Sequence, residues 1–286
     1  MFISGIADEA GPDIETQIRA HTELGWKHIE LRTIEDKCIT DLDDAAFDDV
    51  AQRLADAGIT VSCFASQLAN WARPIDTDFE VDLAELRRAI PRMQQMGTRF
   101  IRCMSYPNCD PPLADADWRN AVIDRMSRLA EIAADADVVL VHENCHGWAS
   151  QNAETTIELL NEVGSEHLKL VFDTGNPISS GVNVWELYQA LREHTVYIHI
   201  KDYRWTESAA GERTTQACFP GEGEGCVERI VKDLLQSGYD GGFSIEPHIT
   251  SVIHLAQTAS DPEEAYKTYV EYGRRFTSLL DSIRSA

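Results

Sequence analysis

The sequence predicts a (β/α)8 TIM barrel that spans residues 1–286 as a single domain. Three observations lead to this fold class. Short apolar segments rich in β-branched residues alternate with segments of helical periodicity, and this alternation occurs eight times along the chain. The chain length of 286 residues is typical of one such barrel. No G-x-G-x-x-G fingerprint follows a predicted strand, which counts against a doubly wound open sheet, the main alternative.

The first half of the chain contains four strand–helix units. The predicted strands are residues 2–7, 28–34, 59–66 and 99–106. The helices between them are predicted from apolar residues spaced three or four positions apart. The first three helices end at glycines, a residue type that favours the left-handed conformation beyond a helix. These glycines are Gly25, Gly58 and Gly97.

The second half repeats the pattern. Its predicted strands are residues 138–144, 168–176, 196–203 and 241–248. Helices are expected at 153–163 and within 184–191, 227–235 and 266–283. A long loop, residues 203–225, is expected between the seventh strand and its helix. Because loops of this length in compact domains are often functional, we expect it to act as a lid.

Composition excludes several classes of function. Asp and Glu number 48 against 25 Lys and Arg, a net charge of −23, which would repel the phosphates of a nucleic acid. No run of about 18 apolar residues occurs, so no membrane span is expected. The first residues lack the basic and apolar regions of a secretory signal. The seven cysteines are odd in number and form no C-x-x-C pair, which favours reduced thiols and a cytoplasmic location.

A polar side chain that could bind a metal ion stands at the end of each of the last four predicted strands. These side chains are Glu143, Asp173, His199 and Glu246. The carboxyl ends of barrel strands meet at one face, so the four should converge there. Alone, Asp173 could cap a helix and His199 could be a core histidine. Together, three buried carboxylates would repel one another unless a cation lay between them. The set of oxygen and nitrogen ligands predicts one divalent metal ion: Mn²⁺, Mg²⁺, Co²⁺ or Zn²⁺.

The motifs "HEN", "FDTGNP", "HIKD", "PGEGEG" and "IEPH" resemble those of the xylose-isomerase-like barrels, specifically the sugar phosphate isomerase/epimerase family. The resemblance covers nearly the whole chain. It implies that the four residues above bind a single divalent metal ion and that Glu143 and Glu246 also act as acid–base groups. Some members have a histidine three residues after the strand-six aspartate, where this chain has Asn176, so their substrate is not carried over.

The resemblance implies a metal-dependent isomerase or epimerase of a sugar, polyol or keto-sugar, acting by proton abstraction next to a carbonyl through a metal-held enediolate. One alternative is a lyase of the inosose or 3-dehydroshikimate dehydratase type. A DNA-repair endonuclease is a further alternative, which the charge of −23 opposes. The last alternative is a barrel that binds a sugar but has no catalytic activity.

The expected partner is a small-molecule sugar or polyol, with no nucleic acid and no membrane; a homo-oligomer is left open. Five residues are expected to hydrogen-bond the substrate: Glu30, His146, Asn176, Lys201 and Arg204. His248 lies just beyond Glu246 and is expected to orient its carboxylate.

Overall fold

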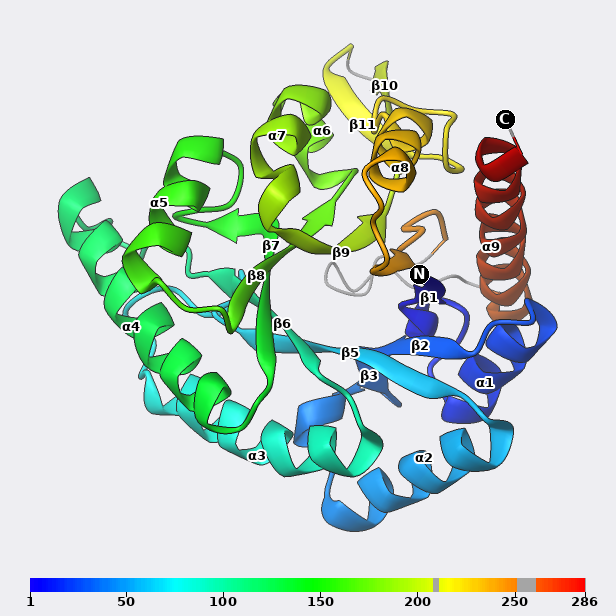
Figure 1. Cartoon of the computed structure of the whole chain (residues 1–286), viewed down its shortest axis with the longest axis horizontal. Coiled ribbons are helices and arrows are strands. Elements are labelled where there is room, and N and C mark those ends of the chain that lie inside the picture. The colour runs from blue at the N-terminus through cyan, green and yellow to red at the C-terminus, as the bar shows by residue number, and fades with distance from the viewer. Residues whose placement is uncertain (208–210, 251–260, 286) are drawn as a thin grey trace.

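In the computed structural model, which describes residues 1–207, 211–250 and 261–285, eight parallel strands form a ring with helices around it (Figure 1). The ring strands are β1 (Phe2–Gly5), β2 (His28–Leu31), β5 (Thr60–Leu68), β6 (Phe100–Ser105), β7 (Val139–Gly147), β8 (Leu168–Asp173), β9 (Thr195–Ile200) and β12 (Gly242–Ile245). Their hydrogen-bonded order is β1-β12-β9-β8-β7-β6-β5-β2, and a parallel bridge between Ile6 and Glu30 joins the two ends. The predicted (β/α)8 fold is therefore confirmed.

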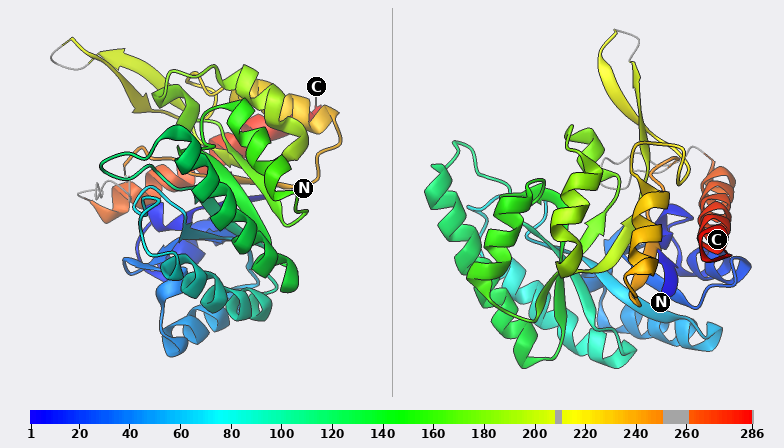
Figure 2. Two further views of the ribbon diagram at one scale, coloured as in Figure 1. Left: turned by 90° about the vertical axis from the view of Figure 1, so that its left-hand side faces the viewer. Right: turned by 45° about the horizontal axis from the view of Figure 1, so that its top comes forward.

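Helices cover the outside of the ring in both views of Figure 2. They are α1 (Ile14–Glu23), α2 (Asp44–Ala57), α3 (Glu80–Met96), α4 (Asp115–Asp135), α5 (Ala153–Val163), α6 (Asn176–Ser179), α7 (Val184–Leu191), α8 (Val227–Gln236) and α9 (Pro262–Ser285), with short 3-10 turns η1 (Ala7–Glu9), η2 (Ile39–Asp41) and η3 (Arg192–His194). Gly58 and Gly97 end α2 and α3 with φ of 64° and 67°, as the sequence predicted. Gly25 lies one residue beyond the C-cap of α1.

Strand geometry decides which side chains reach the site. Successive side chains of a strand point to opposite faces. In β7, Val139 and Val141 belong to a small buried cluster that also contains Tyr197 of β9. Glu143 continues this face, whereas Leu140 and His142 lie on the face that packs against the helices. A carboxylate is thus carried toward the inside of the ring by the same alternation that builds the core.

Three segments depart from the sequence prediction. The predicted strand 168–176 ends at Asp173, and Asn176 already belongs to α6. The predicted strand 28–34 stops at Leu31, and β3 (Thr33–Ile34) and β4 (Lys37–Cys38) form a separate antiparallel pair. Thr33 donates to Asp8 through both its backbone N and its Oγ1, which holds the chain away from the ring at this point.

The prediction of a long loop at residues 203–225 is wrong for part of this segment. There, β10 (Tyr203–Glu207) and β11 (Arg213–Ala217) form an antiparallel hairpin. The hairpin projects from the barrel in Figure 2. On the hairpin, Arg213 stacks 3.8 Å from the ring centre of Trp205. Residues 208–210 of the expected lid lie outside the described residues.

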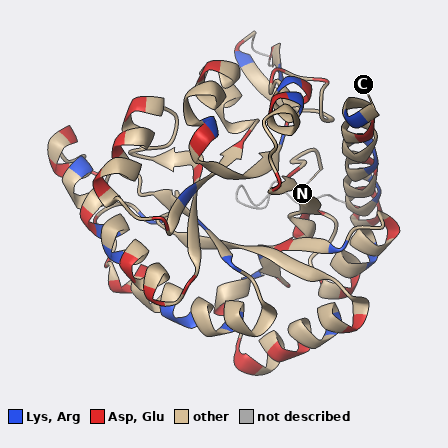
Figure 3. Ribbon diagram, viewed as in Figure 1, with Lys and Arg blue, Asp and Glu red and all other residues tan. Residues whose placement is uncertain are grey.

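Acidic residues are spread over the outer helices (Figure 3), in keeping with the net charge of −23. Among the described residues, none of the helices combines the length and the apolar character that a membrane crossing requires.

Candidate metal centre

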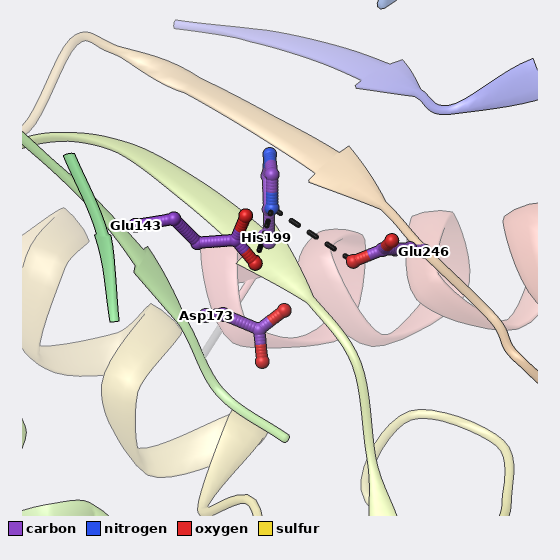
Figure 4. Close-up of side chains that lie close together, drawn as sticks. All are labelled: Glu143, Asp173, His199 and Glu246. Carbon is purple, nitrogen blue, oxygen red and sulfur yellow. Dashed lines mark ion pairs between the residues drawn. The ribbon is translucent and has the colours of Figure 1, made fainter. Parts of the chain in front are cut away.

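Glu143, Asp173, His199 and Glu246 converge at the carboxyl ends of four neighbouring strands (Figure 4). Glu143 lies in β7, Asp173 ends β8, His199 lies in β9 and Glu246 follows β12 directly. Each offers one ligand atom within 4.8 Å of the others, and all four residues are buried. The structure thus brings together the residues that the sequence placed at strand ends.

Glu143 and Asp173 each accept hydrogen bonds through one carboxylate oxygen, which fixes the side chain. The side-chain nitrogen of Asn176 donates to Glu143 Oε1 at 2.9 Å. Asp173 Oδ1 accepts from the backbone nitrogens of Gly175 and Asn176 at 2.8 and 2.7 Å. Asn176 therefore fixes two of the carboxylates from the start of α6.

Glu246 is held in the same way. Its Oε1 accepts from Arg32 Nη1 at 2.7 Å and lies 3.1 Å from His248 Nε2. His248 thus contacts the carboxylate that it was expected to orient.

His199 is oriented by Glu30, whose Oε1 lies 3.2 Å from Nε2. A proton on Nε2 that points at Glu30 leaves Nδ1 facing the cluster. Nδ1 lies 3.7 Å from Glu143 Oε1 and 3.9 Å from Glu246 Oε2. A carboxylate behind a ligand histidine is a recurrent feature of metal sites.

Each of the four residues keeps one buried atom without a hydrogen bond. These atoms are Glu143 Oε2, Asp173 Oδ2, His199 Nδ1 and Glu246 Oε2. Buried polar atoms usually have hydrogen-bond partners, and the convergence of these four on one point makes them candidate ligand atoms for a cation. Three oxygens and one nitrogen suit a divalent ion, and the cluster is able to hold one.

Buried cations already offset part of the negative charge. Lys201 Nζ lies 3.1 Å from Asp173 Oδ2 and 2.5 Å from Glu246 Oε2. Arg102 Nη1 lies 3.3 Å from Glu143 Oε2. These oxygens are therefore ion-paired with Lys201 and Arg102, although the contacts do not have the geometry of hydrogen bonds.

Protonation follows from these contacts. Burial alone would raise the pKa of Glu143, but Arg102 and His199 outweigh it and bring this pKa to about 2. Burial is likewise outweighed at Glu246, where Lys201 and His248 hold the pKa well below its usual value. At Asp173 burial prevails over Lys201, so its pKa is raised. Burial opposes the charged form of His199, but Glu30 and Glu143 raise its pKa to about 10, so a metal ion that binds Nδ1 would displace a proton from it.

An open cavity of about 1150 Å³ lies over the cluster. Of the residues expected to bind substrate, His146, Asn176 and Lys201 line it. Glu30 is buried behind His199. Arg204 is exposed on β10, donates to Gln216 Oε1 at 3.3 Å, and is not among the described residues that line the cavity.

Two cationic residues of the site were missed from the sequence. Arg32 and Arg102 both line the cavity and are buried. Arg102 interrupts the apolar run of β6, and Arg32 directly follows β2. A polar residue within or just after an apolar strand is the signal that predicted the four candidate ligands, and it would also have singled out these two arginines.

Comparison with known proteins places the chain in a family. Residues 18–276 match the family model described as xylose isomerase-like TIM barrel, and the chain belongs to this family. It is 26% identical over 142 residues to an inosose dehydratase of Clostridium botulinum, covering 46% of this chain and 47% of the relative. It is 25% identical over 177 residues to an inosose dehydratase of Geobacillus thermodenitrificans, covering 57% and 59%. The matches thus span about half the length of these curated relatives.

Solved structures share the fold over nearly the whole chain. The IOLI protein with a bound zinc atom has a TM-score of 0.75 and 18% identity, with 99% of each chain covered. A xylose isomerase-like protein of Mycobacterium smegmatis in complex with magnesium has a TM-score of 0.69 and 17% identity, covering 98% of this chain and 97% of the other. The 3-keto-D-glucoside 4-epimerase of E. coli has a TM-score of 0.69 and 17% identity, covering 96% and 100%.

Proposed function

We propose that this protein is a divalent-metal-dependent enzyme that removes a proton next to the carbonyl of a keto-polyol and then eliminates water. The observation that carries the proposal is the set of four buried ligand atoms that converge on one point, beside an open cavity that Glu143 and Glu246 line. A divalent ion bound there would act as a Lewis acid that polarises the carbonyl and acidifies the adjacent C–H.

Glu143 and Glu246 are the proposed acid–base pair. They lie on either side of His199 in Figure 4, and β8 and β9 separate their strands in the ring. Both carboxylates are ionised, because their pKa values lie below the usual range. In this proposal the two carboxylates serve opposite faces of a substrate placed between them.

The proposed reaction balances without an oxidant. One glutamate takes the proton from the carbon next to the carbonyl, and the electrons of that C–H bond form a new C=C bond. The neighbouring C–O bond breaks as the hydroxyl leaves. A carboxyl group that has gained a proton returns it to that hydroxyl, which departs as water.

The sequence relatives favour elimination over isomerisation. The two matched relatives are inosose dehydratases, although the matches cover about half of each chain. The second candidate is epimerisation, in which the second glutamate returns the proton to the opposite face of the same carbon. The epimerase of known structure supports this candidate through its fold alone.

We propose that His146, Asn176 and Lys201 bind substrate hydroxyls, since all three line the cavity. Glu30 would act indirectly, by orienting His199. Arg204 would contact substrate only from the hairpin above the cavity.

Incubation of Mn²⁺-loaded protein with a panel of inososes and ketohexoses in D₂O tests the proposal. We expect deuterium next to the carbonyl and a product lighter than the substrate by one water. Glu143→Gln and Glu246→Gln should abolish both signals. Glu166→Gln, at an exposed glutamate, is the matched control and should change neither.

The outcomes separate the candidates. Deuterium incorporation without loss of water would favour the epimerase over the dehydratase. Binding of metal and ligand without any exchange would contradict catalysis and favour a sugar-binding barrel. Exchange that persists in Glu246→Gln would refute the acid–base assignment.

A further inference from the structure

A second group of potential metal ligands lies beside the candidate centre. Glu9, Glu246 and His248 each offer an atom within 4.8 Å of the others, and all three are buried. His248 Nε2 lies 3.1 Å from Glu246 Oε1 and 3.5 Å from Glu9 Oε1. The group shares Glu246 with the first centre but uses its other oxygen, Oε1 instead of Oε2.

The guanidinium of Arg32 occupies this second group. Its Nη1 lies 2.7 Å from Glu246 Oε1, and its Nη2 lies 3.4 Å from Glu9 Oε1. Asp8 fixes the other edge by accepting from Nε at 2.9 Å and from Nη2 at 2.8 Å. Arg32 is 8% exposed, and a guanidinium stays protonated in proteins. The group therefore holds a permanent cation in a fixed position.

We infer that Arg32 takes the place of a second metal ion and thereby keeps the centre mononuclear. Carboxylates and an imidazole that converge on one point need a cation, and here the chain supplies it. A metal on each oxygen would make Glu246 a bridging ligand. Arg32 prevents this by occupying Oε1, so Oε2 alone faces the first centre.

This role has a consequence for the class of reaction. Two-metal hydrolysis uses a pair of ions roughly 3.5–4 Å apart that share ligands. The only other group of potential ligands among the described residues is filled by an arginine side chain. The inference therefore opposes two-metal hydrolysis at this site, independently of the acidic surface.

Arg102 provides a matched comparison. It is also buried, lines the cavity and pairs with a ligand carboxylate, Glu143. Around Arg102, however, the described residues hold no second group of three ligands. Removing Arg102 should open no new metal position.

Zinc stoichiometry tests the inference without any measurement of activity, so it stands or falls separately from the proposed reaction. Metal-free protein is equilibrated with excess Zn²⁺, passed over a desalting column and subjected to elemental analysis. We expect one tightly bound zinc in the natural protein and two in Arg32→Ala. Arg102→Ala should bind one, and Arg32→Ala combined with Glu9→Gln should return to one.

Two results would overturn the inference: a single zinc in folded Arg32→Ala, or two zinc ions in the natural protein. Arg32→Ala could lose its fold in the absence of metal, because it leaves buried carboxylates without a cation. In that case circular dichroism is recorded during zinc addition. Recovery of the native spectrum with two bound zinc ions supports the substitution of arginine by metal, and failure to recover contradicts it.

Discussion

At the scale of single residues, the site depends on which atom of each ligand is held and which is left free. Glu30 illustrates this, because its contact with His199 Nε2 at 3.2 Å leaves Nδ1 for the cluster. The sequence allowed Glu30 to be singled out as a polar residue late in a strand. Its role could not be predicted, because its partner is 169 positions away and only the closed ring brings them together.

Replacing Glu30 by Gln should weaken metal binding by about 10- to 100-fold, because a neutral amide orients the imidazole less strongly and makes it less basic. Zinc affinity measured by competition with a chromogenic chelator checks this. Glu166→Gln is the surface control, with no expected change. Equal affinities in the natural protein and Glu30→Gln would rule out the orienting role.

At the scale of elements, the strand-to-helix connection after β9 explains two of the sequence motifs. The Asp202 carboxylate accepts from the backbone nitrogens of Gly221, Gly223 and Gly225 at 2.9, 3.0 and 2.8 Å. It thereby ties the "PGEGEG" loop to the segment that carries Lys201. The hairpin β10–β11 escaped prediction because its strands are polar and half-exposed, so no buried face produces a hydrophobic alternation.

Gly223→Ala should destabilise the protein by about 1–3 kcal/mol, because a crowded site must shift to accept a methyl group. A Cβ at this position would lie 2.3 Å from the carbonyl oxygen of Tyr203 and 2.4 Å from Asp202 Oδ1. Urea unfolding gives the change in free energy. The neighbouring variant Glu222→Ala removes only an exposed ion pair with Arg275 and should cost far less. Equal costs for the two variants would contradict the close packing at Gly223.

A second element-scale contact joins the first helix to the last. His21 of α1 is buried, with Nδ1 2.7 Å from the carbonyl oxygen of His28 and Nε2 2.9 Å from the hydroxyl of Tyr269 in α9. Burial lowers the pKa of His21 from 6.5 to about 4. The folded state therefore holds this imidazole neutral while the unfolded chain can protonate it.

Stability should consequently fall as the pH is lowered from about 6.5 towards 4, and the His21 contribution should then level off. Above this window both states are neutral at His21, so its contribution is fully present. Urea unfolding from pH 7 to pH 4, with His21→Gln as the comparison, measures it. The free energy of unfolding of His21→Gln should change less with pH than that of the natural protein. The same change with pH in both proteins would show that His21 is not involved.

At the scale of the whole molecule, closure of the ring assembles the site from both halves of the chain. The convergence of the four candidate ligands could be predicted because each lies within or directly after an apolar strand and the fold places these positions together. Arg32 reaches Glu246 across 214 positions of sequence through the β1–β2 side of the ring. No local pattern encodes that contact, so the cation that balances Glu246 emerged only from the structure.

Anomalous diffraction from crystals soaked in Zn²⁺ would show whether Glu143, Asp173, His199 and Glu246 bind one divalent ion. We expect one strong peak at about 2.0–2.2 Å from Glu143 Oε2, Asp173 Oδ2, His199 Nδ1 and Glu246 Oε2. A fully soaked crystal with no peak among these atoms, or with its zinc bound elsewhere, would contradict the account.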